Sequence, residues 1–398
     1  MAVADFRQDR DPNNNNSRRR VLHVCHSYYP PYLDVARQYC ALFNREQWHI
    51  TTVFLTGARD DAIAQQIGSD EVIFLEHASA ALRGLKLGQI RQLRAIARAG
   101  KFEFAIAHRY KALYICSHIP GLFVIGVHHR PGGYKRWTRR FFVRRHRESL
   151  LLLGVSDAVR DNMRQSLPEF AAERIETLYN HIDVDAQQSE LLSRAVARQQ
   201  LGLPADAYIF GNVGRLHPDK DQSTLIRAFA AARAHCDAYL VIIGKGRLEQ
   251  ELKQLATTEG VADRVIFTGP VPDARRYFRA FDSFALSSDR EPFGMVLLEA
   301  MAAELPIVAT DGGGAPEVLG AAGMLFPVGD VAALADLLCR LYRLEAPALD
   351  QLRDAMAQRL HQLFSDRAVA AAFWQLPLVG QLECQGAAAN SATSAAKR

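Results

Sequence analysis

Two glutamates eight residues apart, Glu291 and Glu299, flank a short Pro-Gly loop in the second half of the chain. The apolar run 283–286 before the loop is typical of a strand, and good helix formers follow over residues 295–303. We therefore expect a helix to begin near Gly294, where free backbone N–H groups and the helix dipole favour an anion such as a diphosphate. Carboxylates beside such a site are suited to accept hydrogen bonds from hydroxyl groups.

Three further loops carry residues suited to one ligand. Arg215 and Lys220 follow the strand expected at 208–214, and they offer a guanidinium fork and a mobile ammonium group for phosphate oxygens. The glycines of 244–248 would let a base or ribose lie against the chain, and 311–317 opens another helix after another strand. Four such loops at one sheet edge predict a site for a nucleotide sugar, which has hydroxyls on both sides of its diphosphate.

The elements that position these loops alternate between strand and helix along the chain. Because the apolar runs are mostly unalternating, the sheets should be parallel and covered on both faces. The pattern predicts an α/β fold of two doubly wound Rossmann-like domains that face each other across a cleft, with ligands beyond the carboxyl ends of the strands. The expected strands are 21–25, 49–55, 71–75, 104–108, 122–127 and 150–155 in the first domain, and 208–214, 239–244, 265–267, 283–286 and 306–308 in the second.

The domain boundaries follow from composition. We expect a disordered N-terminal segment (1–20), an N-terminal acceptor-binding domain (21–185), a C-terminal nucleotide-sugar-binding domain (186–365), a helix that crosses back to the first domain (366–385) and a disordered tail (386–398).

Bulk properties narrow the class of protein. The chain of 398 residues is 49% hydrophobic and 23% charged, and no apolar run approaches the roughly 18 residues of a membrane helix. The polar start lacks a signal-peptide core, and the six cysteines are scattered, so we expect a cytoplasmic protein with reduced thiols. Residues 1–200 hold 29 Lys and Arg against 20 Asp and Glu, whereas the remainder holds 19 against 23. The basic first half is expected to meet an anionic partner.

In combination, these motifs resemble the retaining GT-B glycosyltransferases of family four. The resemblance rests on Gly-Arg-Leu at 214–216 with Lys220 five residues after the arginine, Phe-Thr-Gly at 267–269, the Glu-x7-Glu pair, and Asp-Gly-Gly at 311–313 with Pro316-Glu317. It is specific over about 208–345 and weaker in the first half, where it rests on 179–183 and the sheet pattern.

The resemblance implies a role for each matching residue in a metal-independent hexosyltransferase. Arg215 and Lys220 would bind the diphosphate, Glu299 would accept hydrogen bonds from the ribose, and Glu291 would hold the donor sugar. The remaining donor contacts would come from Phe293, Gly294, Met295 and Val296 at the helix start, and from Gly244, Arg247, Leu248 and Val271 around the base. It implies no cofactor beyond the nucleotide-diphosphate sugar, which is a substrate, and no bound metal; Asp183 and Asp185 are interpreted as structural.

In the first domain, the candidate site residues are two neighbouring histidines and a group of tyrosines. His128 follows a strand and is predicted to approach the donor sugar as the fourth catalytic residue, with His129 as its rival. Many members of the family have a Gly-Gly loop that touches donor phosphate after the first strand, whereas this chain departs from that pattern and has three tyrosines within 26–32. Those tyrosines suggest a stacking surface for an acceptor sugar.

The stretch Arg130 to Arg147 holds eight Lys and Arg, no acid and four aromatic residues. This composition predicts contact with the inner face of an anionic membrane or with a phosphorylated glycolipid. The second basic stretch, 82–101, is better interpreted as a solvated helix face. Nothing resembles a nucleic-acid-binding element, so no nucleic acid is expected as a partner.

The predicted function is sugar transfer to a glycan or glycolipid acceptor, in lipopolysaccharide core or related surface-polysaccharide biosynthesis. Two alternatives stay open: a sugar-nucleotide epimerase of the same architecture, and a non-catalytic nucleotide-sugar binder. A nicotinamide dehydrogenase is disfavoured because no Gly-x-Gly-x-x-Gly follows an early strand. The base, the sugar, the linkage and the oligomeric state have no signal in the sequence.

Overall fold

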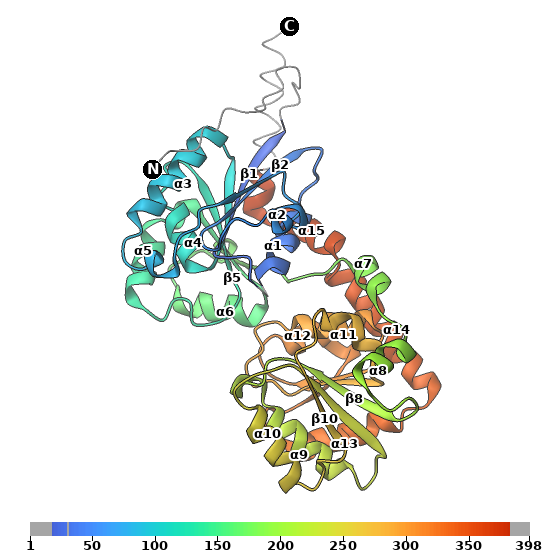
Figure 1. The fold of residues 1–398 in the computed structure, drawn as a ribbon. Coiled ribbons are helices and arrows are strands. Elements are labelled where there is room, and N and C mark those ends of the chain that lie inside the picture. The colour runs from blue at the N-terminus through green and yellow to red at the C-terminus, as the bar shows by residue number, and fades with distance from the viewer. Residues whose placement is uncertain (1–17, 30–31, 383–398) are drawn as a thin grey trace.

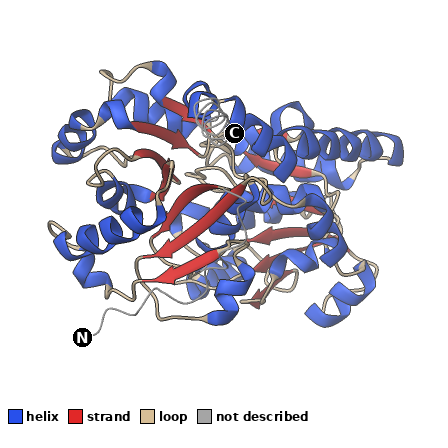
Figure 2. Cartoon of the chain, turned by 90° about the horizontal axis from the view of Figure 1, so that it is seen from above, coloured by secondary structure: helices blue, strands red, loops and turns tan. Residues whose placement is uncertain are grey.

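The computed structural model describes residues 18–29 and 32–382, and the chain folds into two lobes (Figure 1). Each lobe is a parallel sheet with helices packed around it, and the view from above shows strands enclosed by helices (Figure 2). The fold is therefore the expected pair of doubly wound α/β domains. The tail 386–398 and most of the N-terminal segment, 1–17, lie outside the described residues.

The N-terminal domain contains a seven-stranded sheet in the order β3-β2-β1-β4-β5-β6-β7. Every neighbouring pair is parallel, so all the carboxyl ends lie at one edge. The strand order reverses between β1 and β4, and this switch point leaves a crevice where such sheets bind ligands. The strands are β1 (Arg19–Cys25), β2 (Trp48–Phe54), β3 (Glu71–Phe74), β4 (Phe104–His108), β5 (Phe123–His128), β6 (Leu150–Gly154) and β7 (Ile175–Thr177).

The C-terminal domain repeats this plan with six parallel strands in the order β10-β9-β8-β11-β12-β13. Its switch point lies between β8 and β11. The strands are β8 (Tyr208–Val213), β9 (Ala238–Ile243), β10 (Val265–Gly269), β11 (Ser283–Leu286), β12 (Ile307–Thr310) and β13 (Met324–Phe326).

Helices fill the connections between strands. Those of the first domain are α1 (Tyr32–Ala41), α2 (Asp61–Gln66), α3 (Leu87–Gly100), α4 (Arg109–Cys116), α5 (Trp137–Arg145) and α6 (Asp157–Ser166). The remainder of the chain forms α7 (Val184–Glu190), α8 (Arg194–Leu201), α9 (Gln222–Ala232), α10 (Glu249–Thr258), α11 (Met295–Ala302), α12 (Ala315–Leu319), α13 (Val331–Tyr342), α14 (Ala346–Leu363) and α15 (Asp366–Gln375). Short 3-10 turns are η1 (Ser79–Leu82), η2 (Arg147–Ser149), η3 (Ala172–Arg174), η4 (Pro218–Lys220), η5 (Ala274–Ala280) and η6 (Gly320–Ala322).

The chain crosses between the domains twice, and the two crossings lie side by side. Ile182 forms a parallel bridge with Ser365, and the Ile182 N–H donates to the carbonyl of Phe364. Beyond this point α15 packs on the first domain, where the Trp374 indole N–H donates to the Leu42 carbonyl at 2.9 Å. The helix after residue 365 therefore belongs spatially to the first domain.

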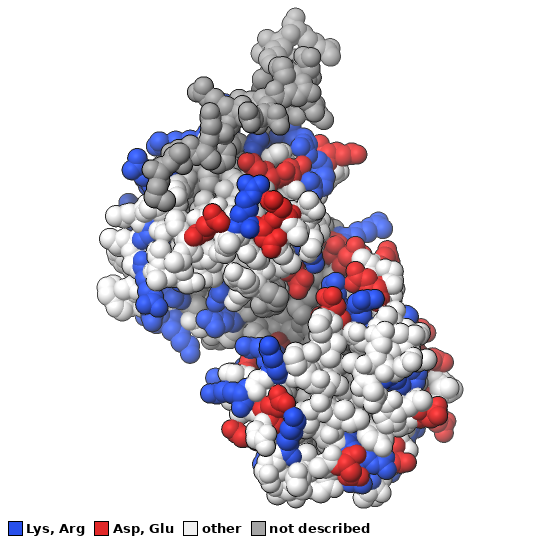
Figure 3. Space-filling view, in the orientation of Figure 1, with Lys and Arg blue, Asp and Glu red and all other residues white. Residues whose placement is uncertain are grey.

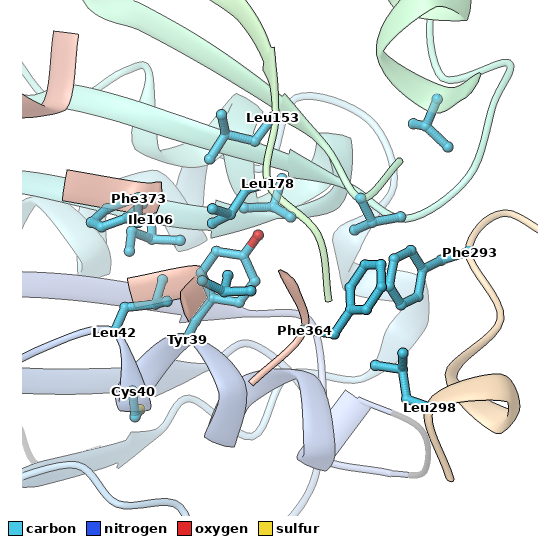
Figure 4. Close-up of a cluster of buried hydrophobic side chains, with 14 of the residues drawn as sticks. Tyr39, Cys40, Leu42, Ile106, Leu153, Leu178, Phe293, Leu298, Phe364 and Phe373 are labelled. Carbon is cyan, nitrogen blue, oxygen red and sulfur yellow. The ribbon is translucent and has the colours of Figure 1, made fainter. Parts of the chain in front are cut away.

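A continuous apolar core joins the domains at these crossings. The ring of Phe293, from the loop before α11, lies 5.8 Å from that of Phe364 (Figure 4). It also lies 5.9 Å from the ring of Tyr179. A second cluster of buried side chains lies within the C-terminal domain. The position of α11 is thus coupled to the interface between the domains.

The expected disordered segment 1–20 extends two residues too far, because β1 begins at Arg19. Arg19 donates to both carboxylate oxygens of Glu103, and its guanidinium lies 4.3 Å from the ring centre of Trp48. Arg18 and Arg20 likewise pair with acids distant in sequence, Asp70 at 2.8 Å and Glu71 at 3.6 Å.

Candidate active site

The switch point between β8 and β11 brings together two of the predicted loops. The Ser287 hydroxyl donates to the Lys220 carbonyl at 3.0 Å, and the Asp289 N–H donates to the Asp219 carbonyl at 3.2 Å. These hydrogen bonds hold the turn after β8 against the loop after β11. The basic residues of one loop therefore lie beside the acids of the other.

Lys220 and Glu291 meet directly at this point. The Lys220 ammonium lies 2.5 Å from a carboxylate oxygen of Glu291, and their side chains are only 19% and 10% exposed. Removing either member of an ion pair so shielded from water would leave the other charge buried without a partner. The structure thus supplies a preformed cation and acceptor at the predicted position.

The loop after β12 supports this pair from behind. The Gly314 N–H donates to the Glu291 carbonyl at 2.8 Å. Gly313 has a φ of +63°, and a Cβ there would stand 2.1 Å from the same carbonyl oxygen. Only glycine allows this close approach, so the glycine run at 312–314 serves to position the Glu291 loop.

Arg215 lies on the same turn as Lys220 but is far more accessible. Its side chain is 72% exposed, with one nitrogen 3.4 Å from Asp219. The Gln222 amide donates to the Arg215 carbonyl at 3.1 Å and fixes the backbone rather than the guanidinium. Arg215 is therefore free to swing onto a ligand.

The helix start predicted at Gly294 is present as the beginning of α11. Gly294 has a φ of +101°, and the N–H groups of the first helical turn, including those of Met295 and Val296, have no carbonyl partner within the helix. Phe293 is 2% exposed, so its ring anchors the loop in the core and only its backbone can face a ligand.

Glu299 lies further along α11 and faces the first domain. The pKa of the Glu299 carboxyl is raised to about 7, mainly by burial and then by the Asp34 carboxylate on α1, while Arg275 partly offsets the rise. The Gln38 amide on α1 also lies 3.6 Å from the sulfur of Met295. Glu299 is thus a half-buried, easily protonated acid at the domain interface.

The loop after β9 packs on the loop after β8. A Cβ on Gly244 would stand 1.9 Å from the Gly214 carbonyl oxygen, and one on Gly246 would stand 2.1 Å from that of Leu216. These glycines are therefore required by chain packing. Arg247 is exposed, and Leu248 and Val271 are half-buried, which leaves them accessible beside the same sheet edge.

The two neighbouring histidines after β5 have different environments. His128 is 5% exposed, with its Nε2 2.8 Å from the Tyr134 hydroxyl, and burial lowers its pKa to about 3. His129 is partly exposed, and its pKa falls to about 4 through burial and then the Arg109 charge. Both rings are neutral at pH 7, and His129 has the better access to a ligand.

His129 belongs to a buried histidine chain that the sequence analysis missed. Its Nε2 lies 3.0 Å from His108 Nδ1, and His108 Nε2 lies 2.8 Å from His23 Nε2. The far nitrogen of His23 lies 3.1 Å from the Thr52 hydroxyl. These residues are far apart in sequence, but β1, β4 and β5 are adjacent in the sheet. The spacing of His23, Cys25 and His108 would suit a metal ion, yet the histidine nitrogens already bond to one another.

The structure also assigns local roles to other predicted residues. Tyr28 is buried, its hydroxyl donates to the Ala58 carbonyl, and its ring packs on Phe54, so it belongs to the core and not to a sugar-stacking surface. Tyr29 and Tyr32 remain accessible. Asp183 caps α7 by accepting from the Ala186 N–H, in keeping with a structural role.

Glu317 makes an interdomain contact that its sequence context did not indicate. From α12 its carboxylate accepts hydrogen bonds from the N–H groups of Asp157 and Ala158, at 2.5 and 2.7 Å. These groups form the N-terminus of α6, which faces α12 across the domain boundary (Figure 1). A carboxylate at a helix N-terminus is favourable, so Glu317 links the two domains.

Two family models match the chain in succession. The model described as Glycosyltransferase Family 4 matches residues 35–186, and the one described as Glycosyl transferases group 1 matches residues 193–361. Together they cover most of both domains, from α1 to α14, while β1 lies before the first match.

The similar proteins include enzymes of bacterial surface-glycan synthesis. The lipopolysaccharide core biosynthesis glycosyltransferase LpsE of Rhizobium meliloti is 35% identical over 188 residues, which is 46% of this chain and 53% of LpsE. The chain thus spans about half the length of the curated relatives it matches.

Solved structures share the fold over nearly the whole chain. A glycosyltransferase from Rickettsia africae superposes with a TM-score of 0.78 at 14% identity, covering 92% of this chain and 99% of that one. Anabaena Alr3699/HepE, solved with UDP-glucose, gives 0.70 at 21% identity and covers 93% and 99%. At these identities the likeness shows the architecture alone.

Proposed function

Because the chain belongs to the GT-B glycosyltransferases of family four, we propose that it transfers a hexose from a nucleotide-diphosphate sugar to a glycan or glycolipid acceptor with retention of anomeric configuration. The acceptor belongs to lipopolysaccharide core or a related cell-surface polysaccharide. This choice is supported by the similarity to LpsE, whose printed role is lipopolysaccharide core biosynthesis.

The observation that carries the proposal is the shielded Lys220–Glu291 pair beside the start of α11. As the anomeric bond breaks, negative charge gathers on the leaving diphosphate and the sugar becomes oxocarbenium-like. Lys220, Arg215 and the first N–H groups of α11 stabilise the diphosphate more in the transition state than in the ground state. Glu291 accepts hydrogen bonds from the donor sugar, and Glu299 accepts them from the ribose.

This set of residues supplies the charge that a divalent metal provides elsewhere, so we propose metal-independent transfer. No carboxylate at the site is assigned as a nucleophile. As the acceptor oxygen bonds to the anomeric carbon and the bond to the diphosphate breaks, the acceptor hydroxyl gives its proton to the departing phosphate oxygen. We propose that His129, neutral and partly exposed, approaches the donor sugar in preference to His128.

We also propose that the enzyme acts at the cytoplasmic membrane surface. In the stretch Arg130 to Arg147, Trp137 and Phe141 are 70% and 66% exposed on α5, and basic residues surround them. Exposed aromatic rings among cations suit the interface of an anionic bilayer. Within the described residues, no helix is long and apolar enough to cross a membrane.

The experiment is a turnover assay with a panel of nucleotide sugars in the presence of EDTA. Glu291→Ala should lower turnover by about a hundredfold, equivalent to roughly 3 kcal/mol of transition-state stabilisation. Arg290→Ala is the matched control, because Arg290 is the preceding residue of the same loop and its side chain is 85% exposed.

Other outcomes separate the competing functions. A new sugar nucleotide formed without acceptor would indicate an epimerase, and binding without turnover would indicate a non-catalytic binder. Activity that disappears in EDTA and returns with a divalent cation would contradict metal independence. Equal turnover of Glu291→Ala and the control would remove Glu291 from the reaction.

A further inference from the structure

We propose that the acceptor carries a phosphate or carboxylate group, which binds five basic residues at the switch point of the N-terminal sheet: Arg83, Lys86, Arg109, Lys111 and Arg139. This five-cation site names the acceptor class, and it rests on the proposed function only for the identity of the ligand as an acceptor.

The five residues come from three separate segments that the fold brings together. Arg109 and Lys111 lie in the first turn of α4, directly beyond the carboxyl end of β4. Arg83 and Lys86 lie between η1 and α3, and Arg139 lies on α5. The carboxyl end of β4 borders the crevice between β1 and β4, where a doubly wound sheet binds its ligand.

Aromatic rings hold three of these cations in place. The Lys86 ammonium lies 4.5 Å from the ring centre of Tyr114, and the Arg139 guanidinium lies 4.5 Å from that of Tyr110. Arg109 lies 5.1 Å from the ring centre of Tyr32 and donates to its hydroxyl at 2.8 Å. These contacts orient positive charge without neutralising it.

Within residues 18–29 and 32–382, no carboxylate forms an ion pair with any of the five. The pKa of Lys111 is lowered by burial and then by Arg109, Arg83 and Arg139, and that of Lys86 by burial and then by Lys111 and Arg139. The cations therefore lie close enough to repel one another. An anionic ligand would remove this repulsion.

One of the five basic residues, Arg109, also has a strained backbone conformation. Arg109 has a φ of +69°, a left-handed conformation that non-glycine residues adopt only rarely. The strain sets Arg109 at the strand end, within the electrostatic reach of His26 and His129. A charged group bound there would place a neighbouring hydroxyl near the carboxyl edge of the sheet.

The site differs from the proposed membrane surface, although both use α5. Arg139 is half-buried on the face that also carries Phe142 and buried Val143, whereas Trp137 and Phe141 are exposed on another face. A partly enclosed cation cluster suits a small charged substituent, and the exposed rings suit a bilayer. Basic side chains also gather on the flank of the first domain (Figure 3).

The test compares two double variants of the full chain with equal charge. Arg83→Gln/Lys111→Gln removes two members of the site that make no described side-chain hydrogen bond. The control, Arg98→Gln/Lys101→Gln, removes one Arg and one Lys from exposed positions near the end of α3. We expect inorganic phosphate to bind the site variant at least tenfold more weakly than the control by calorimetry.

The ligand-free site variant should also melt at a higher temperature than the control, because mutual repulsion is relieved. A purely structural role would lower its melting temperature. Equal phosphate affinity in both variants, or a lower melting temperature in the site variant, would overturn the proposal.

The acceptor class is tested with a bacterial glycolipid fraction before and after phosphatase treatment, and after carbodiimide amidation of its carboxylates. One of the two treatments should lower transfer at least tenfold, and the affected one identifies the group. Transfer that survives both treatments would refute the anionic acceptor while leaving glycosyl transfer intact. Absence of any transfer, with phosphate binding lost only in the site variant, would refute the enzyme function and leave the anion site.

Discussion

At the switch point between β8 and β11 each basic side chain has a carboxylate beside it, whereas at the switch point between β1 and β4 the basic side chains face one another and tyrosine rings. Lys220 pairs with Glu291 and Arg215 with Asp219. The five-cation site of the first domain has no such partner among the described residues.

This difference between the two switch points indicates which kind of ligand each can bind. At the switch point between β8 and β11, a ligand must offer phosphate to the basic side chains and hydroxyl groups to the carboxylates, as a nucleotide sugar does. At the five-cation site, a ligand needs only a negative charge that can reach the basic side chains. On the proposed function, the first of these would be a chemically selective donor site and the second a charge-selective acceptor site.

Removing the Lys220 charge from its ion pair with Glu291 should have the largest effect on kcat/KM. Lys220→Met leaves Glu291 shielded without its cation and removes charge stabilisation from the leaving diphosphate, so we expect kcat/KM to fall more than a hundredfold, or about 3 kcal/mol. Lys253→Met, an exposed lysine on α10, is the control. Steady-state kinetics that show equal values for the two variants would mean that the pair has no role in transfer.

Weakening the contact between the two domains should have an intermediate effect on kcat/KM. Glu317→Ala removes both hydrogen bonds to the N-terminus of α6, each worth about 1.5–3 kcal/mol because the acceptor is charged. We expect kcat/KM to fall about tenfold as the joined arrangement of domains loses population.

Nucleotide affinity measured by calorimetry should stay unchanged in Glu317→Ala, since the donor site lies within one domain. Asp311→Ala, an exposed acid before the same helix, is the control. A radius of gyration by X-ray scattering equal to that of the control, together with normal kinetics, would show that Glu317 does not hold the domains together.

The smallest effect should come from Glu299, which faces Asp34 across the interface. Its pKa of about 7 exceeds the ordinary 4.5, so the folded protein holds an extra proton between these values and loses stability as pH rises through 7. Glu299→Gln should therefore melt about 2 °C higher than the native chain at pH 8 and nearly equally at pH 5.

Glu304→Gln, the same change at an exposed position just after α11, should show no such pH dependence. Thermal melts of both variants across pH 5 to 8 provide the measurement. A stabilisation by Glu299→Gln that is the same at both pH values would mean that the Glu299 carboxyl titrates normally.

Local patterns in the sequence predicted the order of strand, loop and helix at the proposed donor site. Strand, loop and helix follow one another in the order expected from 283–303, and α11 begins next to Gly294 because its conformation and the following helix formers are local properties. The parallel sheets likewise follow from apolar runs between helices. Even so, the roles of Gly244 and Gly313 became evident only from neighbouring loops, since each glycine avoids a carbonyl of a distant segment.

The sequence by itself determined that two doubly wound domains form and which loops end their strands, because hydrophobic periodicity and turn chemistry act over a few residues. Only the tertiary structure decided which charges meet. Glu317 reaches α6 from about 160 residues away, the histidine chain joins three strands, and the five-cation site assembles from three segments. Electrostatic interaction depends on distance in space and on exclusion of water, and neither is set by position along the chain.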